Sequence, residues 1–226
     1  SLPVPNSDEP LITRNEIVYQ PSASLLNLLS KIKSKNKPTK NLLVFADPVF
    51  NNSDNRLMAK SENQESLPTV LGLNLRDFRL MDGNGNIPRL FASQNEADSI
   101  QEVVGKSSSA IVSGFEANRE RALNSDLADY RILHFATHGL VDVERPEVSS
   151  IVLSQFDEQG NKREGFLRLQ DIYAMNLVTD LVVISACQSG VGKEIKGEGL
   201  MSINNAFLQA GAKSVLSSAW KVDDYA

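Results

Sequence analysis

One short run of apolar residues constrains the fold of this chain more than any other feature. Leu181-Val182-Val183-Ile184 contains three β-branched residues and no polar position. Strands buried on both faces of a parallel sheet have this pattern, whereas half-exposed strands alternate apolar and polar residues. Small residues, Cys187 and two nearby glycines follow. Because functional groups of α/β proteins gather at the carboxyl ends of central strands, we expect Cys187 to stand at a functional edge.

A second apolar run has the same pattern and ends in a histidine. Residues 131–136 lead into Thr137-His138-Gly139. The chain contains only two histidines, His134 and His138, and Cys187 is its only cysteine. A thiol and an imidazole, each at the end of a core strand and close to glycine, predict a Cys/His catalytic dyad. The alternatives are a cysteine that packs as a small hydrophobe and a loop histidine whose hydrogen bonds are satisfied. As a catalytic loop residue, His138 is expected to carry little packing.

The motifs do not favour a metal or nucleotide site. On a strand, His134 and His138 lie about 13 Å apart, too far to share one zinc ion. With Cys187 as a third ligand, no fourth is evident. The segment Gly190-Val191-Gly192-Lys193 lacks the first glycine and the final Ser/Thr of a phosphate-binding loop. We therefore predict no metal and no cofactor, and we interpret His134 as a core histidine with a hydrogen-bonded partner.

Composition limits the classes of protein to which the chain can belong. It has 226 residues, 41% of them hydrophobic, and a formal net charge of −5. Its scattered Lys and Arg residues do not form the clustered basic face of a nucleic-acid module. No apolar run approaches the ~20 residues that span a bilayer, and no secretory signal opens the sequence. A single cysteine excludes an internal disulfide, so we expect a cytoplasmic protein without nucleic-acid or membrane contacts.

Apolar periodicity and turn residues predict alternating strands and helices, hence a mostly parallel, three-layer α/β/α sandwich. Residues 1–15 are interpreted as a linker or upstream remnant and residues 16–226 as one domain. Asp82–Asn86 has strong turn chemistry and predicts a hairpin, and a second hairpin is expected around residues 157–164. Further strands are predicted at 16–20, 42–46, 150–154, 165–169 and 213–219, and helices from 21 onward and at 94–104, 116–123, 169–175 and 198–210.

Both motifs resemble those of the CHAT peptidases, a caspase-like family often joined to tetratricopeptide repeats. Residues 133–139 resemble the histidine motif of the family, and Ser185-Ala186-Cys187-Gln188-Ser189-Gly190 its cysteine motif. Further similar segments are Val44–Pro48, Gln94–Ala97, Gly197–Leu200, Gln209–Ala212 and Ala219–Asp224. The resemblance extends from about Glu16 to Ala226. Family members usually continue beyond the position of Ala226, so we expect a chain truncated at its C-terminus.

The resemblance implies a caspase-like fold and hydrolysis of peptide bonds in a protein substrate. Cys187 corresponds to the nucleophile and His138 to the catalytic histidine, and no third member of a triad is evident. The backbone N–H groups of Gly139 and Cys187 are the implied oxyanion donors. A tetratricopeptide-repeat region or a regulatory protein is the implied partner.

Four residues are implied as substrate contacts: Asp47, Trp220, Asp223 and Asp224. Residues 220–224 resemble the Trp-x-Val-x-Asp segment of separases, in which an acidic residue lies under a basic side chain. Asp224 therefore resembles a receptor for Arg or Lys at the cleaved position. The alternatives are that Asp223 and Asp224 cap a following helix and that Trp220 is a core residue.

Two other functions stay open at this point. One is a catalytically idle caspase-like domain that serves as a scaffold for interactions. The other is a cysteine hydrolase or acyltransferase for small molecules, which would have a closed pocket over Cys187. An endopeptidase instead needs an open groove with a free strand edge.

Overall fold

A computed structural model describes residues 9–10, 13–14, 37–57, 69–70, 73–74, 86–142, 148–185 and 198–217. The chain divides into two units, Ser1–Lys33 and Ser34–Ala226. In the first unit, the Thr13 amide donates a hydrogen bond to the Pro10 carbonyl. The strand predicted at 16–20 and the helix predicted after it lie outside the described residues.

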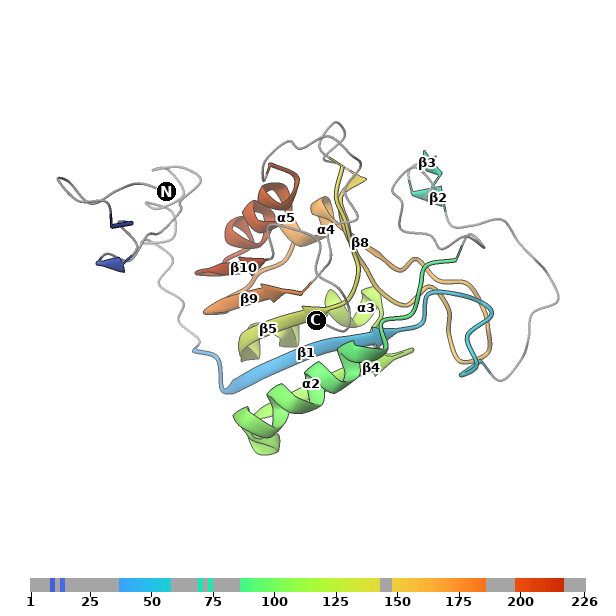
Figure 1. The fold of residues 1–226 in the computed structure, drawn as a ribbon, viewed down its shortest axis with the longest axis horizontal. Helices are drawn as coiled ribbons and strands as arrows, with labels where there is room; N and C mark the ends of the chain where they lie inside the picture. Colours follow the sequence, from blue (N-terminus) through green and yellow to red (C-terminus); the bar gives the residue numbers. More distant parts are fainter. Residues whose placement is uncertain are drawn as a thin grey trace. The chain divides into compact units, whose positions relative to one another are not determined.

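The second unit is built on a five-stranded sheet in the order β10-β9-β5-β1-β4 (Figure 1). All four neighbouring pairs are parallel, which confirms the predicted mostly parallel sheet. The strand predicted at 42–46 is longer, because Lys40 and Pro48 also join the ladder, with an irregularity in the register between Ala46 and Pro48. The strand bounds are β1 Lys40–Pro48, β4 Ser109–Gly114, β5 Tyr130–Ala136, β9 Leu181–Ile184 and β10 Val215–Ser217.

Helices cover both faces of this sheet and complete the α/β/α sandwich (Figure 1). The long helix α2, Phe91–Val104, packs on one face through Ala97 against Leu42, Val44 and other β1 and β5 residues. On the opposite face lie α3 (Arg119–Ala122), α4 (Leu169–Tyr173) and α5 (Glu198–Gln209). Two 3-10 turns, η3 at Lys106–Ser108 and η4 at Ser125–Asp129, lead into β4 and β5.

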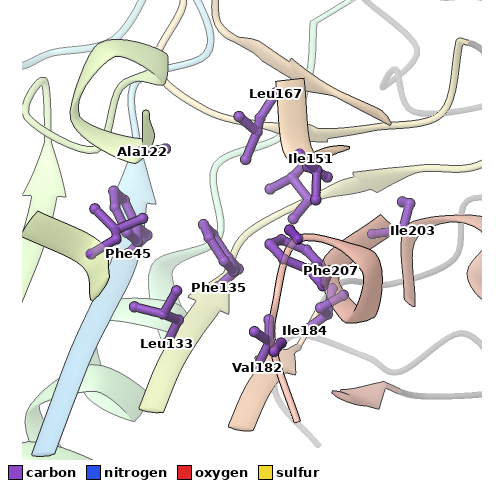
Figure 2. Close-up of a cluster of buried hydrophobic side chains, with 14 of the residues drawn as sticks. Phe45, Ala122, Leu133, Phe135, Ile151, Leu167, Val182, Ile184, Ile203 and Phe207 are labelled. Atoms are coloured by element: carbon purple, nitrogen blue, oxygen red, sulfur yellow. The ribbon is translucent and has the colours of Figure 1, made fainter. Parts of the chain in front are cut away.

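The main core lies between the sheet and α5, and aromatic rings form its centre (Figure 2). Phe45 of β1 stacks on Phe135 of β5, with ring centroids 5.0 Å apart. Phe135 in turn contacts Phe207 of α5 at 5.6 Å. All three side chains are fully buried. Alternate residues of each strand face this core, so the neighbouring positions of β1 and β5 face α2.

A second, antiparallel sheet of three strands follows β5 in the chain. It has the order β6-β7-β8, with β6 at Gly139–Leu140, β7 at Ser150–Val152 and β8 at Phe166–Arg168. β7 and β8 flank an excursion closed by the Phe156–Lys162 bridge, which confirms the hairpin predicted around 157–164. A separate two-stranded pair joins β2 (Thr69–Val70) to β3 (Leu73–Asn74). The turn predicted at 82–86 lies outside the described residues except for Asn86.

The short strands β2, β3 and β6 are not among the predicted elements, and β4 and α3 also differ from the sequence prediction. β4 was not predicted, because only Ala110-Ile111-Val112 is apolar and serine and glycine surround it. The helix predicted at 116–123 is only one turn long. It begins after Asn118, whose side-chain oxygen accepts a hydrogen bond from the Arg121 amide at 2.9 Å and so caps α3.

Among the described residues, no helix has the length and apolarity needed to cross a membrane.

Candidate active site

The register of two neighbouring strands shows that β5 and β9 end at the same edge of the sheet. β5 and β9 are parallel, and Phe135 lies opposite Ile184. The amide of Ser185 continues this ladder by donating to the Phe135 carbonyl at 3.0 Å. His138 is three residues beyond Phe135 (138 − 135 = 3), and Cys187 is three beyond Ile184 (187 − 184 = 3). Cys187 itself lies outside the described residues.

The turn after β5 holds His138 firmly. Its carbonyl accepts a hydrogen bond from the Val152 amide at 2.8 Å. The preceding residue, Thr137, donates its hydroxyl to the Val152 carbonyl at 2.6 Å. The imidazole contacts the ring of Phe50, with centroids 5.1 Å apart. His138 is only 7% exposed, so the expectation that this loop residue carries little packing is wrong.

The imidazole of His138 has a backbone partner that defines its tautomer. Its Nε2 lies 2.7 Å from the carbonyl oxygen of Pro88. A carbonyl oxygen can only accept, so Nε2 carries the hydrogen, and in the neutral ring the lone pair then lies on Nδ1. This contact supplies a third component that the sequence did not reveal, because a main-chain carbonyl has no residue-type signature.

The other predicted site residues lie as follows. Gly139 begins β6 and pairs with Ile151 of β7. Asp47 is buried at the carboxyl end of β1, the same edge of the sheet that His138 follows. Trp220, Asp223 and Asp224 lie outside the described residues.

The Asp47 carboxylate is surrounded by two guanidinium groups. It accepts from Arg89 at 2.7 and 2.5 Å and from Arg56 at 2.8 Å. The hydrogen bonds and charge of Asp47 raise the pKa of Arg89 although burial opposes this. Arg56 also pairs with Asp54 at 2.7 Å. Burial alone would raise the pKa of Asp54, but the hydrogen bonds and charge of Arg56 lower it.

His134 lies on the other face of the sheet, toward α2. It is 6% exposed, and its Nε2 is 2.9 Å from Oε1 of Glu96. The same carboxylate oxygen accepts the Ser185 hydroxyl at 2.9 Å. Burial favours the neutral acid, yet His134 and Ser185 together lower the pKa of Glu96. This network joins α2 to β5 and to the residue that follows β9.

The two histidines thus have separate partners and separate faces. Within the described part of the chain, no three His, Cys, Asp or Glu residues are grouped so that they could hold a metal ion.

A parallel sheet with helices on both faces and a buried histidine at its carboxyl edge defines an α/β protein of caspase-like architecture. A scan against family models identifies the CHAT domain over residues 2–226. The chain therefore belongs to the CHAT domain family, a caspase-like peptidase family. A search of curated proteins returned no match.

Proposed function

We propose that this protein is a cysteine endopeptidase that cleaves peptide bonds of a protein substrate through Cys187 and His138. The observation that supports the proposal is the β5–β9 register: the strands are parallel, Phe135 lies opposite Ile184, and in the sequence His138 and Cys187 each follow three residues later. Membership of the CHAT domain family supports it. A nucleophilic thiol without a disulfide partner suits the reducing cytoplasm, where we expect the protein to act.

The chemistry follows from the tautomer of His138. Nδ1 takes the proton of the Cys187 thiol, and the thiolate attacks the scissile carbonyl carbon. The resulting imidazolium gives its proton to the leaving amine as the C–N bond breaks, which leaves a thioester. Water then attacks the thioester while Nδ1 accepts its proton, and the thiol is restored with release of the carboxylate product. The Pro88 carbonyl keeps the ring oriented through both steps by accepting from Nε2.

The negative charge that develops on the carbonyl oxygen needs fixed donors. We assign this role to the backbone N–H groups of Gly139 and Cys187. Each such donor is typically worth ~3 kcal/mol of transition-state stabilisation.

Covalent labelling tests the dyad directly, because an adduct on the single cysteine has only one possible site. The probe is a peptidyl acyloxymethyl ketone, and the adduct is measured by intact mass. We expect labelling of the wild type and none of Cys187→Ala. His138→Gln retains an amide donor for Pro88 but no base, so its labelling should be slower by about a hundredfold or more.

Two controls separate the outcomes. Iodoacetamide reports whether Cys187 is accessible, and circular dichroism reports whether each variant is folded. A folded protein whose cysteine reacts with iodoacetamide but not with any peptidyl probe would indicate an idle scaffold domain. Labelling by small acyl electrophiles alone would indicate a hydrolase of small molecules.

We further propose that Asp224, supported by Trp220 and Asp223, receives a basic side chain at the cleaved position. An Asp–Arg pair is bidentate and charge-assisted, which gives both affinity and orientation. The measurement is a peptide library varied at that position, used on the wild type and on Asp224→Ala. We expect the wild type to prefer Arg or Lys by at least about tenfold and the variant to lose this preference. An unchanged preference in Asp224→Ala excludes the assignment.

A further inference from the structure

The carbonyl that orients His138 belongs to a segment with no regular secondary structure. Pro88 lies in residues 86–90, between the β3 region and the start of α2. No ladder hydrogen bond fixes such a segment, so its position depends on the contacts of the residues beside it. The contacts on each side of Pro88 therefore decide where its carbonyl points.

Two side chains from the end of β1 and the loop after it hold the neighbours of Pro88. Asn51 pairs with both backbone groups of Ile87: its amide donates to the Ile87 carbonyl, and its oxygen accepts from the Ile87 amide at 3.1 Å. Asp47 holds Arg89 on the other side through two hydrogen bonds of 2.7 and 2.5 Å. Pro88 is thus fixed from both flanks by β1 and its loop.

Asp47 is itself held in one unusual conformation. Its φ of 46° is the only positive φ among the described non-glycine residues. Such a conformation is costly for an L-residue and persists only when surrounding contacts enforce it. Its amide donates to the Ser93 hydroxyl of α2 at 3.0 Å, and Arg56 donates to its backbone carbonyl at 2.9 Å. Strained, buried and multiply bonded, Asp47 is a rigid anchor for Arg89.

We propose that Asp47 and Arg89 are positioning residues, which hold the Pro88 carbonyl against Nε2 of His138 and so orient the imidazole. This assigns Asp47 a role that acts through Arg89 and Pro88 rather than through contact with substrate. The effect on catalysis rests on the proposed peptidase function. The orientation of the His138 Nε2–H group by Asp47 and Arg89 does not depend on that function.

The test measures how fast the His138 Nε2–H proton exchanges with water. Ring-15N labelling gives signals from only two histidines, and His138→Gln assigns them. In the wild type the His138 signal should be visible and protected. In Arg89→Gln, which leaves Asp47 paired with Arg56, exchange should accelerate by at least about tenfold because the acceptor is displaced.

Arg119→Gln is the matched control. Arg119 makes an equivalent two-bond contact with Asp171, at 3.0 and 2.6 Å, between α3 and α4. Its guanidinium is similarly half-buried, at 29% against 25% for Arg89. Its loss should leave His138 exchange within about twofold of the wild type, because the Pro88 segment is untouched. The His134 signal serves as an internal reference in each spectrum.

Kinetics give the second readout. Arg89→Gln and Asp47→Asn should lower kcat by about tenfold or more with KM nearly unchanged, because they disturb the base and not the substrate contacts. Arg89→Lys keeps the positive charge but cannot make the two-bond guanidinium contact with Asp47. In this variant both the exchange rate of the His138 Nε2–H proton and kcat should be intermediate. If Arg89→Gln does not fold, Arg89→Lys is used for the same comparison.

The proposal is overturned if the wild type shows no protected His138 proton, or if protection survives in the Arg89 variant. Equal acceleration in the Arg89 and Arg119 variants also overturns it, since the effect would then be general destabilisation. A rise in KM with an altered residue preference in Asp47→Asn would place Asp47 at the substrate instead. Should the protein lack peptidase activity, the exchange comparison alone decides.

Discussion

At the scale of single residues, two histidines four positions apart have different tasks. The pleat of β5 turns His134 toward α2, where it meets Glu96. His138 has passed the end of the strand and meets the Pro88 carbonyl. The same residue type is therefore part of a buried polar network in one case and a candidate base in the other. Substitution should separate the two roles.

Replacement of His134 should cost stability and spare reactivity. His134→Ala leaves a cavity and takes a buried partner from Glu96, so we expect the free energy of unfolding to fall by about 2 kcal/mol. Urea denaturation measures this loss. Peptidyl labelling of Cys187, measured below the unfolding transition, should stay within about threefold of the wild type. Loss of labelling in a stable His134→Ala protein would contradict the division and revive a shared role for both histidines.

The residue scale also shows what sequence can and cannot reveal about the site. A single cysteine and two histidines are visible in composition, and their positions after apolar runs predict the dyad. The role of the Pro88 carbonyl cannot be predicted from residue types, because every residue has a backbone carbonyl. The Asp47–Arg89 pair joins positions 42 residues apart, and nothing in local spacing links them. Asp47 was predicted from family resemblance to contact substrate, which stays untested.

At the scale of elements, glycines end two helices for different reasons. Gly105 ends α2 with φ 95°, and an added Cβ there would meet no atom within 4 Å. Gly211 follows α5 with φ 113°, and a Cβ would lie 2.0 Å from the Leu177 carbonyl oxygen. The Leu177 amide donates to Ala210 at 2.7 Å, so this close approach joins α5 to the segment before β9. Position 105 requires glycine only for its positive φ. Position 211 requires glycine for its positive φ and also because a Cβ would clash with the Leu177 backbone.

Alanine at each glycine should therefore have unequal effects. Gly105→Ala should lower the free energy of unfolding by about 1 kcal/mol, the cost of a strained φ alone. Gly211→Ala should cost about 3 kcal/mol or more, since backbone atoms cannot yield as a flexible side chain can. Urea denaturation of both variants provides the comparison. Equal losses would mean that the Leu177 segment moves away freely, contrary to its close contact with α5.

The elements that sequence predicted well are those with strong local signals. Continuous apolar runs identify β1, β5 and β9, although Leu181 and Val183 of β9 are only half-buried. The amphipathic pattern and Gly211 identify α5 and its end. β4 was missed because it is an edge strand with a half-buried, small and polar composition. Its pairing with β1 over Leu42–Pro48 makes it a strand, and that partner is distant in sequence. Short strands of this kind are decided by tertiary pairing rather than by propensity.

At the scale of the whole molecule, several hydrogen-bonded carboxylates share one response to pH, and three of them, Glu96, Asp171 and Asp180, join segments distant in sequence. Asp54, Glu96, Asp171 and Asp180 all have a lowered pKa. For Asp180, hydrogen bonds from Lys213 and Arg131 are the main cause. A group with a lowered native pKa releases its proton more readily when folded. Its contribution to stability is therefore complete above its ordinary pKa and is lost as the pH falls through the native value.

The melting temperature should thus be nearly flat around neutral pH and fall below about pH 4, the ordinary range for these groups. For a chain of this size, each kcal/mol lost lowers Tm by about 2–4 °C. Differential scanning calorimetry over a pH series measures the profile. A Tm that is constant down to about pH 3 would falsify this linkage.

Asp171→Asn isolates one contribution to that profile. Burial opposes ionisation of Asp171, but Arg119 and the Arg168 amide lower its pKa. The variant should lose about 1–2 kcal/mol at neutral pH. The difference from the wild type should shrink as acid protonates Asp171 in the wild type. A difference that stays constant with pH would show that the charge of Asp171 is not what stabilises α3 against α4.

The strand order β10-β9-β5-β1-β4 also has a consequence for the time course of synthesis. The pairs β1–β4 and β1–β5 lie within residues 40–136, whereas β9, which pairs with β5, begins at residue 181, and β10 pairs with β9. Chains leave the ribosome N-terminus first, and earlier segments fold earlier. The half of the sheet that carries the imidazole is therefore complete in translation before the thiol exists. If the proposed function holds, a nascent chain carries its general base before its nucleophile has been made, so it cannot cleave neighbouring proteins until the last strands are synthesised.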